Sequence, residues 1–488
     1  MPPALSFRKA SLAAQRCVLW ALAALCLALP CRAQRMVFAH YMLTNQGYQG
    51  DTDPTQDAKI AAYEREIREA QALGIDGFAL NAGGWLQQPS YIRYAAQMFE
   101  AAVRLHSGFH LMFSADMCCG NGLADVEDMM RRFAGNPRYA SVYFCYDNKF
   151  VLTTFAGDKE GVDFWQQVRS DLATGAHPSA ATAPNALASG SPSNAPLPTF
   201  LVPAFFWGGE LPAKNAVQHG FDAWRNTIDG SFYWGIAGVP GSGGPLDQLR
   251  SSEAYASVMQ AAKKLYMAPV TVQFWGANAN RYYEYSGGAG MRRMWMNAIE
   301  KTHPDWVEII TWNDFIEGTS ISPIDDPNAY PSANYLTSSG IPAHTLHYFH
   351  GHAAAGQLMR YYIEWYKTGK PPAITRDAVY WFYRTQPIRY NAGKPPVEHK
   401  YGPLQDAIYV TTNLTAPAEL RVTCGKHVSV VRMPAGSTDT VVAFTPGPAP
   451  QFQLVREGKV AASGHGNDPI EATPLWNDFY YSTGSIER

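Results

Sequence analysis

The chain has 488 residues, of which 41 are acidic and 39 basic, and its formal net charge is −2. This balance argues against a nucleic-acid partner, because proteins that bind phosphate backbones carry an excess of Lys and Arg. The hydrophobic fraction of 47% excludes an intrinsically disordered chain. With 13% aromatic residues, the chain has enough Trp, Tyr and Phe to line a binding cleft as well as to fill a core.

The N-terminal residues have the pattern of an export signal. A basic stretch from Arg8 to Arg16 precedes an apolar run from Cys17 to Leu29. We therefore predict a secretory signal peptide over residues 1–33, cleaved near Ala33, and a secreted protein without a stable membrane anchor. An uncleaved anchor is the alternative, but the run is shorter than the roughly 20 residues that a spanning helix needs. Lipidation is a further alternative, disfavoured by the Pro-Cys sequence that follows the run.

Four cysteines remain after removal of such a signal, namely Cys118, Cys119, Cys145 and Cys424. They are too few for a disulfide scaffold and lack the spaced Cys/His pattern of a zinc site. We expect one disulfide from Cys145 to Cys118 or Cys119, with buried free thiols as the alternative. No metal and no other cofactor is expected.

Strand-like apolar runs alternate with segments of helical periodicity over the first three quarters of the chain. The eight expected strands are residues 37–42, 75–81, 109–116, 150–155, 200–206, 230–236, 270–274 and 306–311. This pattern predicts an α/β fold, a (β/α)8 TIM barrel over residues 34–373, in which residues 173–198 form a flexible insertion rich in Ala, Ser, Pro and Gly. A doubly wound open sheet is the alternative, but no Gly-rich phosphate loop follows an early strand.

The pattern changes after Pro371, where short segments of alternating apolar and polar residues lie between Gly, Pro and Asn turns. We predict a C-terminal all-β sandwich over residues 374–488. We expect this module to brace the barrel, and the alternative is that it binds polysaccharide. No heptad pattern indicates assembly, so a monomer is expected.

Polar and aromatic residues gather at the ends of the expected strands. In a barrel, the carboxyl ends of the strands face one mouth, where the active site is built. Aromatic rings stack on the C–H faces of sugars, while Asp, Asn and His bind hydroxyl groups. We therefore predict a carbohydrate site, although packing in the core or rim is the alternative for each Trp taken alone. Its expected residues are His40, Tyr41, Asn81, Asp116, Trp207, Trp234, Trp275, Trp312 and Asn313.

Asp314 and Glu317 are the expected catalytic pair. They follow the last expected strand and are three residues apart, so both carboxyl groups can reach one cavity. Glycoside hydrolysis needs an acid for the leaving oxygen and a second carboxylate that activates water or attacks the anomeric carbon. The alternative is a helix N-terminus, where Asp and Glu offset the helix dipole.

Several motifs occur together and in a fixed order along the chain. They are FAHYM at 38–42, AQALGIDGFALN at 70–81, FSAD at 113–116, PAFFWGG at 203–209, DGSFYW at 229–234, EIITWNDFIE at 308–317, YYIEWYKTG at 361–369 and VYWFYR at 379–384. In combination they resemble glycoside hydrolase family 71, the α-1,3-glucanases or mutanases. One departure follows Asp314, where this chain has Phe-Ile-Glu-Gly-Thr and Tyr-Gly-Glu-Ser is usual in the fungal pattern.

The resemblance implies inverting, metal-independent endo-hydrolysis of α-1,3-glucan on a (β/α)8 barrel followed by a β-sandwich. It maps the family's catalytic aspartate and glutamate onto Asp314 and Glu317, with Glu317 as general acid and Asp314 as general base, or the reverse. It also implies functional roles for Asp76 and, through a looser alignment, for His352. A barrel glycosidase acting on another α-linked polymer, such as a mannan, and a non-catalytic carbohydrate-binding protein are the alternative hypotheses.

Overall fold

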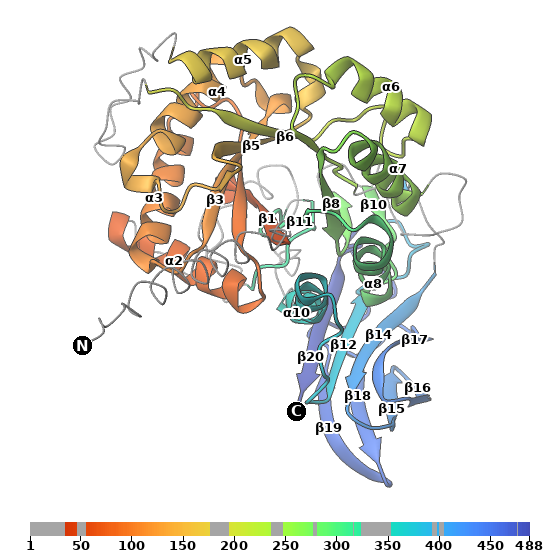
Figure 1. Cartoon of the computed structure of the whole chain (residues 1–488). Helices are drawn as coiled ribbons and strands as arrows, with labels where there is room; N and C mark the ends of the chain where they lie inside the picture. The colour runs from red at the N-terminus through yellow and green to blue at the C-terminus, as the bar shows by residue number, and fades with distance from the viewer. Residues whose placement is uncertain are drawn as a thin grey trace, which may run out of the picture. The chain divides into compact units, whose positions relative to one another are not determined.

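Figure 1 shows the computed structural model of the chain. It describes residues 35–45, 55–175, 195–235, 247–276, 281–315, 317–323, 353–392, 398–399, 405–475 and 477–488. The expected signal peptide, residues 176–194 of the expected insertion, and His352 lie outside these ranges. Met36–Arg488 forms one compact unit. Among the described helices, none combines the length and apolar character that a membrane crossing requires.

A curled sheet of nine strands forms the first part of this unit (Figure 1). Its parallel strands are β1 (Met36–Met42), β2 (Gly77–Ala82), β3 (His110–Asp116), β5 (Lys149–Phe155), β6 (Thr199–Pro203), β7 (Gly230–Phe232), β8 (Leu265–Thr271) and β11 (Trp306–Ile310). They pair in the order β6-β5-β3-β2-β1-β11-β8-β7, and the short β4 (Cys145–Tyr146) pairs antiparallel with β5. An isolated parallel bridge joins Ala204, just past β6, to Phe232 in β7.

Most strands agree with the expected segments, but the fifth and sixth end earlier than expected, at Pro203 and Phe232, and the seventh is displaced. We expected a strand at 270–274, but β8 begins at Leu265 because the preceding helix ends at Ala261. Residues Phe274–Gly276 instead form a separate strand, β9, which pairs antiparallel with β10 (Arg281–Tyr283). A further short strand, β13 (Glu398–His399), pairs with β10.

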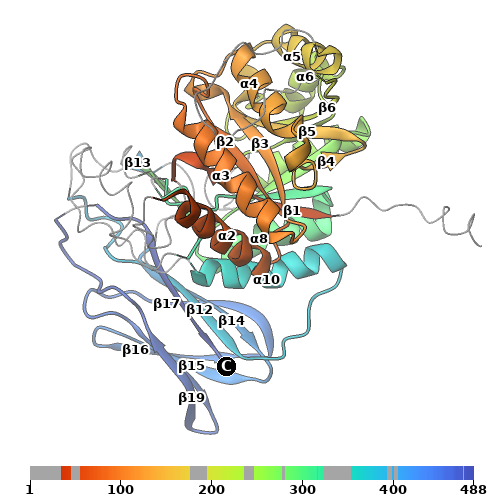
Figure 2. The same ribbon diagram turned by 90° about the vertical axis from the view of Figure 1, so that its left-hand side faces the viewer.

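Helices lie on the outer face of the curled sheet, as Figures 1 and 2 show. They are α2 (Gln56–Ala72), α3 (Ser90–Leu105), α4 (Leu123–Met129), α5 (Val162–Thr174), α6 (Lys214–Trp224), α7 (Gln248–Ala261), α8 (Gly288–Met296) and α10 (Ala353–Thr368). Shorter helical turns are η1 (Leu43–Asn45), η2 (Met117–Cys119), η3 (Met130–Ala134), η4 (Pro137–Tyr139), η5 (Gly157–Lys159) and η7 (Asn297–Thr302). Side-chain caps begin several of them: the Asp247 carboxylate, for example, accepts a hydrogen bond from Arg250 N at 3.0 Å at the start of α7.

Successive side chains of each strand point to opposite faces of the sheet, which creates two cores. The inner core contains Phe38, Met112, Val202, Met267 and Trp306, from five different strands. The larger outer core fills the space between the strands and the helices. A residue's place in this alternation therefore decides whether its side chain can reach the interior of the curled sheet.

The C-terminal part consists of two antiparallel four-stranded sheets. One has the order β17-β14-β12-β20 and the other β16-β15-β18-β19. Their bounds are β12 (Ala378–Arg384), β14 (Ala407–Leu414), β15 (Ala418–Cys424), β16 (His427–Met433), β17 (Gly436–Ala443), β18 (Gln451–Arg456), β19 (Lys459–His465) and β20 (Tyr481–Glu487). Both sheets contribute to one hydrophobic core, in which Trp381 and Phe452 stack with ring centroids 4.2 Å apart. The first sheet contacts the α/β part through β12 and β20, which pack against α10.

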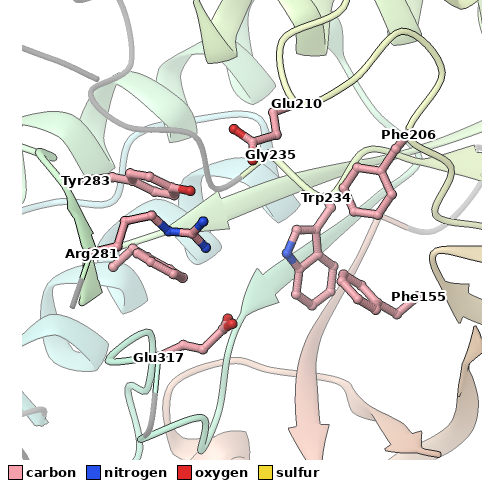
Figure 3. Close-up of a pocket in the computed structure, with 9 residues that line it drawn as sticks. Phe155, Phe206, Glu210, Trp234, Gly235, Arg281, Tyr283 and Glu317 are labelled. Carbon is pink, nitrogen blue, oxygen red and sulfur yellow. The ribbon is translucent and has the colours of Figure 1, made fainter. Parts of the chain in front are cut away.

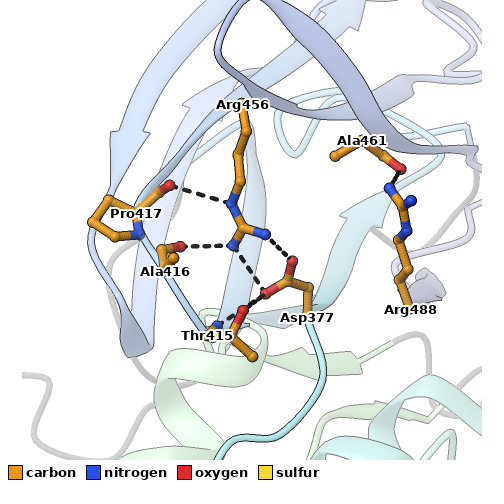
Figure 4. A network of polar contacts seen from close by, with 7 residues as sticks. All are labelled: Asp377, Thr415, Ala416, Pro417, Arg456, Ala461 and Arg488. Atoms are coloured by element: carbon orange, nitrogen blue, oxygen red, sulfur yellow. Dashed lines mark hydrogen bonds and ion pairs between the residues drawn. The ribbon is translucent and has the colours of Figure 1, made fainter.

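A polar network around Asp377 joins the two C-terminal sheets at the start of β12 (Figure 4). Arg456, at the end of β18, forms an ion pair with Asp377 and donates a hydrogen bond to Ala416 O at 2.7 Å. Thr415 N and Oγ1 donate to the same carboxylate at 2.9 and 2.7 Å. Burial disfavours the charged form of Asp377, but the hydrogen bonds from Arg456 and Thr415 outweigh it and lower the pKa to about 2.

The expected disulfide is wrong, because all four cysteines are free. Cys145 lies in β4 opposite Phe150, near the amino end of β5. Cys118 and Cys119 follow the carboxyl end of β3, which runs parallel to β5, so they lie at the other end of the sheet. These three thiols are exposed, whereas Cys424 is buried.

Candidate active site

A cavity of about 170 Å³ lies at the carboxyl ends of the parallel strands (Figure 3). It is lined by Phe155, Phe206, Glu210, Trp234, Gly235, Phe274, Arg281, Tyr283 and Glu317. Several of these residues end or directly follow strands β5, β6 and β7, while others come from the antiparallel pair β9 and β10. The cavity therefore occupies the position in which α/β barrels build their active sites.

Aromatic rings form two walls of the cavity. On one side, the ring of Trp234 meets Phe155 at a centroid distance of 4.7 Å and an angle of 65°. On the other side, Phe274 and Tyr283 stack at 4.5 Å, and the Arg281 guanidinium carbon lies 5.5 Å from each of these two ring centroids. Figure 3 shows the Arg281 guanidinium and the Glu317 carboxyl group extending towards the space beside Trp234.

The turn after β11 orients Glu317. Thr311 Oγ1 accepts a hydrogen bond from Asp314 N at 2.8 Å, and Asp314 Oδ1 accepts one from Glu317 N at 3.1 Å. The backbone closes the same turn, because Thr319 N donates to Asp314 O at 3.1 Å and Thr311 N donates to Thr319 O at 3.0 Å. Asp314 is therefore both a neighbour of Glu317 and part of the scaffold that positions it.

Glu317 has an altered acidity. Burial raises its pKa to about 8, the negative charges of Asp314 and Asp116 raise it as well, and Arg281 opposes the shift. A carboxyl group with this pKa is mostly protonated at neutral pH. It can therefore donate a proton at a pH where an ordinary glutamate is ionised.

A buried pair lies beside the Trp234 wall. His40 of β1 and Glu308 of β11 both point to the interior of the curled sheet, and His40 Nδ1 is 2.7 Å from Glu308 Oε1. Burial raises the pKa of Glu308, while its hydrogen bond with His40 opposes the increase. The His40 ring meets Trp234 edge-on at a centroid distance of 4.7 Å. His40 thus supports a ring that lines the cavity.

Asn81 and Asp116 lie at the carboxyl ends of the neighbouring strands β2 and β3. Asn81 Nδ2 donates to Asp116 Oδ2 at 3.3 Å, and Asp116 Oδ1 accepts from Cys118 N at 2.9 Å. Because Asp116 contributes to the raised pKa of Glu317, its carboxylate belongs to the same electrostatic environment. Expected residues that lie at this end of the sheet include His40, Asn81, Asp116, Trp234, Asp314 and Glu317, and of these Trp234 and Glu317 line the cavity.

Tyr41 and Trp312, which we expected at the sugar site, face the outer helical layer instead. Trp312 Nε1 donates to Glu66 Oε2 of α2 at 3.0 Å, and the Tyr41 ring lies 5.0 Å from Phe78. Both side chains are completely buried. For Tyr41 the reason is strand alternation: His40 points inward, so Tyr41 points outward. Trp312 lies beyond the end of β11, where this alternation no longer applies.

Trp207 and Asp76 also lie away from the cavity. The Trp207 ring stacks on Tyr255 of α7 at 5.8 Å, with an interplanar angle of 5°. Asp76 precedes β2 and is thus at the amino end of the strand, opposite the cavity. There it forms an ion pair with Lys367 at 2.6 Å and accepts a hydrogen bond from Val37 N at 2.8 Å. These contacts give Asp76 a role in joining α10 to the sheet.

Trp275 and Asn313 adjoin the cavity without lining it. Asn313 Oδ1 accepts from Met42 N at 2.7 Å, and its Nδ2 donates to Met42 O at 3.1 Å, which attaches the turn after β11 to the end of β1. Trp275 N donates to Glu317 O at 2.8 Å. Both residues therefore support the turn that carries Glu317.

The sequence reasoning missed several lining residues, notably Phe155, Phe206, Arg281 and Tyr283. Strand alternation could have indicated Phe206. Neighbouring side chains point to opposite faces, so a Trp207 that faces the helices leaves Phe206 facing the interior. Arg281 and Tyr283 lie on the β9–β10 pair, which the sequence pattern did not predict. In the described part of the chain, no group of three or more His, Cys, Asp or Glu residues is arranged to hold a metal ion.

A curled parallel sheet with a protonated carboxyl group, a second carboxylate and aromatic rings at its mouth is typical of glycoside hydrolases. The sequence profile described as "Glycosyl hydrolase family 71" matches residues 33–486. The protein is a glycoside hydrolase and belongs to this family.

Two curated relatives align over most of the chain. Glucan endo-1,3-alpha-glucosidase agn1 of Schizosaccharomyces pombe is 28% identical over 451 residues, covering 91% of this chain and 93% of that protein. Mutanase Pc12g07500 of Penicillium rubens is 25% identical over 468 residues, covering 93% and 89%. Among solved structures, a family 99 endo-α-mannosidase from Bacteroides thetaiotaomicron matches with a TM-score of 0.42 and 12% identity, covering 59% of this chain and 86% of that one.

Proposed function

We propose that this protein is a secreted endo-hydrolase of α-1,3-glucan that inverts the anomeric configuration. The observation that carries the proposal is Glu317, a carboxyl group of pKa about 8 in an aromatic-lined cavity. The names of the two relatives supply the substrate, since both are α-1,3-glucanases by name. Secretion rests on the basic and apolar pattern of residues 1–33.

We further propose that the eight parallel strands close into a (β/α)8 barrel spanning residues 34–373, followed by a β-sandwich domain over residues 374–488. The bridge between Ala204 and Phe232 supports closure, because it joins the two end strands of the sheet. The shared core of the two C-terminal sheets supports the sandwich.

In the proposed mechanism, Glu317 is the general acid and Asp314 the general base. Glu317 transfers its proton to the glycosidic oxygen as the bond from that oxygen to the anomeric carbon breaks. Asp314 accepts a proton from a water molecule whose oxygen forms the new bond to the anomeric carbon from the opposite face. One water is consumed, one glycosidic bond is cleaved, and the new reducing end has the inverted configuration.

A polysaccharide panel tests the substrate and the stereochemistry together. The enzyme is expected to release reducing sugar from α-1,3-glucan and not from α-mannan or β-1,3-glucan. Early NMR spectra should show the β-anomer as the first product. An α-anomer would contradict inversion, and turnover of mannan alone would contradict the substrate. Binding of glucan without turnover would instead indicate a carbohydrate-binding protein.

Trp234→Ala is expected to raise KM for α-1,3-glucan oligosaccharides about fivefold, because loss of one aromatic stacking surface costs about 1 kcal/mol. Trp207→Phe is the matched control, since Trp207 packs against α7 outside the cavity. Steady-state kinetics of both variants measure the effect. Equal KM values for the two would show that Trp234 does not contact the sugar.

A further inference from the structure

We propose that the C-terminal segment Phe479-Tyr480-Tyr481 is a positioning element of the active site, which orients the Glu317 turn and the β9–β10 wall of the cavity. This inference rests on the proposed role of Glu317. It assigns a task to the C-terminal module that is more specific than bracing. A brace could contact the α/β part anywhere, whereas these three consecutive residues contact the segments that line the cavity.

Tyr480 contacts the Glu317 turn directly. Its hydroxyl group is 3.2 Å from Ser320 Oγ, and only 3% of the residue is exposed. Its ring lies against Gly318, where a Cβ atom would approach Tyr480 Cε2 to 2.4 Å. Gly318 also has φ +62°, in the left-handed region that favours glycine. The residue after Glu317 is therefore matched to the Tyr480 ring, at a position where this chain departs from the fungal motif.

Phe479 packs against the β9–β10 wall of the cavity. Its ring is parallel to that of Tyr282, with an interplanar angle of 3° and a centroid distance of 4.6 Å. Tyr282 lies between Arg281 and Tyr283, whose side chains line the cavity. The Phe479 ring also lies 5.4 Å from Trp275, whose backbone N–H donates to Glu317 O. Phe479 therefore connects the wall and the acid turn.

Tyr481 fastens one end of the β9–β10 pair, the end at which Phe274 lies opposite Tyr283. Its backbone N–H donates to Gln273 Oε1 at 2.9 Å, directly before β9. Its hydroxyl group donates to Glu284, directly after β10. Both contacts are therefore at the end of the pair where two lining residues, Phe274 and Tyr283, lie opposite each other. The 479–481 segment thus contacts both strands of this wall as well as the acid turn.

This arrangement predicts a specific change when the segment is loosened. Burial is the main cause of the raised pKa of Glu317, so entry of water past Tyr480 would lower that pKa. The charged groups around Glu317 are Asp314 on its own turn, Asp116 at the end of β3, Arg281 on β10 and Glu210 at the cavity edge, and a substitution at Tyr480 replaces none of them. A displaced and more acidic Glu317 should reduce kcat and move the alkaline limb of the pH profile to lower pH.

Two substitutions of different severity test the proposal in the full-length enzyme. Tyr480→Phe removes the hydroxyl group that contacts Ser320 and keeps the ring, whereas Tyr480→Leu also removes the ring from Gly318. We expect Tyr480→Leu to lower kcat on α-1,3-glucan oligosaccharides about 10- to 100-fold with little change in KM, because small displacements of catalytic groups have effects of this size. Tyr480→Phe should shift kcat and the alkaline limb in the same direction, by less.

Tyr380→Phe is the matched control. Tyr380 is also buried in the C-terminal module and donates to Glu487 Oε1 at 3.0 Å, but at the opposite end of the β12–β20 pair. If both Tyr480 variants have the kcat and pH profile of Tyr380→Phe, the segment has no positioning role. If Tyr480→Leu does not fold, Tyr480→Phe decides alone. Failure of the proposed function would appear separately, as retained activity of a Glu317→Gln variant.

Discussion

Glu317→Gln should lower kcat on α-1,3-glucan by about 10²- to 10⁴-fold, the range that a general acid contributes. Glutamine has nearly the same shape and keeps the backbone contacts of the turn, but its amide cannot transfer a proton to the glycosidic oxygen. The loss should therefore appear in kcat, with KM changed little. Reducing-sugar release from α-1,3-glucan measures it.

Glu364→Gln is a suitable control for this substitution. Glu364 is an exposed glutamate of α10, far along the chain from the acid turn. The same chemical change there is expected to leave kcat unchanged. Circular dichroism should show that both variants are folded. Wild-type turnover by folded Glu317→Gln would remove Glu317 from the mechanism.

The wild-type pH profile should reflect the same group. Because Glu317 acts in its protonated form and its pKa is about 8, kcat/KM is expected to be maintained up to about pH 8. Above that pH it should fall about tenfold per unit as the acid ionises. In Glu317→Gln this alkaline limb should disappear. An alkaline limb near the ordinary pKa of glutamate in the wild type would contradict the raised pKa of Glu317.

The order of the two roles can be determined with a substrate that needs no acid. Fluoride is a good leaving group, so α-glucosyl fluorides of suitable length require the base but not protonation of the leaving atom. Glu317→Gln should hydrolyse them at a rate near that of the wild type, and Asp314→Asn should not. The reverse result would exchange the roles of the two residues.

Sequence patterns predicted most of the strands and the end of the sheet that carries the site, but they did not separate the residues that face the interior from neighbours that face the helices. The side-chain period is two, so an error of one residue exchanges the faces. His40 and Tyr41 show the consequence, since only the first points inward. At the end of β6 the expected Trp207 packs outward, and Phe206 lines the cavity.

Contacts between distant segments account for the remaining differences. Asp76 matches a family motif, yet its ion-pair partner Lys367 lies on the last helix of the α/β part, a pairing that only the fold reveals. Similarly, no local pattern indicates that Arg281 lines a cavity. Its strand pair contacts residues 479–481, which are about 200 residues further along the chain. Local periodicity predicts the helices and strands, whereas the positions of Asp76 and Arg281 depend on tertiary packing.

The junction between the β9–β10 pair and the C-terminal module contains a buried ion pair. Arg384 Nη2 lies 2.7 Å from Glu284 Oε2, and the side chains are 4% and 0% exposed. The Arg384 guanidinium also lies 4.6 Å from the ring centroid of Tyr481, whose hydroxyl group donates to Glu284. Ser286 N donates to the same carboxylate at 2.7 Å. Removal of the arginine would leave a buried carboxylate without its cation.

Arg384→Met should therefore reduce the free energy of unfolding by about 3–5 kcal/mol, the usual cost of removing one partner of a buried ion pair. The midpoint of urea denaturation measures the change. Arg421→Met is the control, because Arg421 pairs with Glu419 on the surface and such a pair contributes about 0–1 kcal/mol. Adding Glu284→Gln to Arg384→Met should recover most of the loss, since the glutamine carbonyl still accepts from Tyr481 and Ser286 without a charge. An Arg384→Met variant no less stable than Arg421→Met would contradict a stabilising role for the Arg384–Glu284 pair.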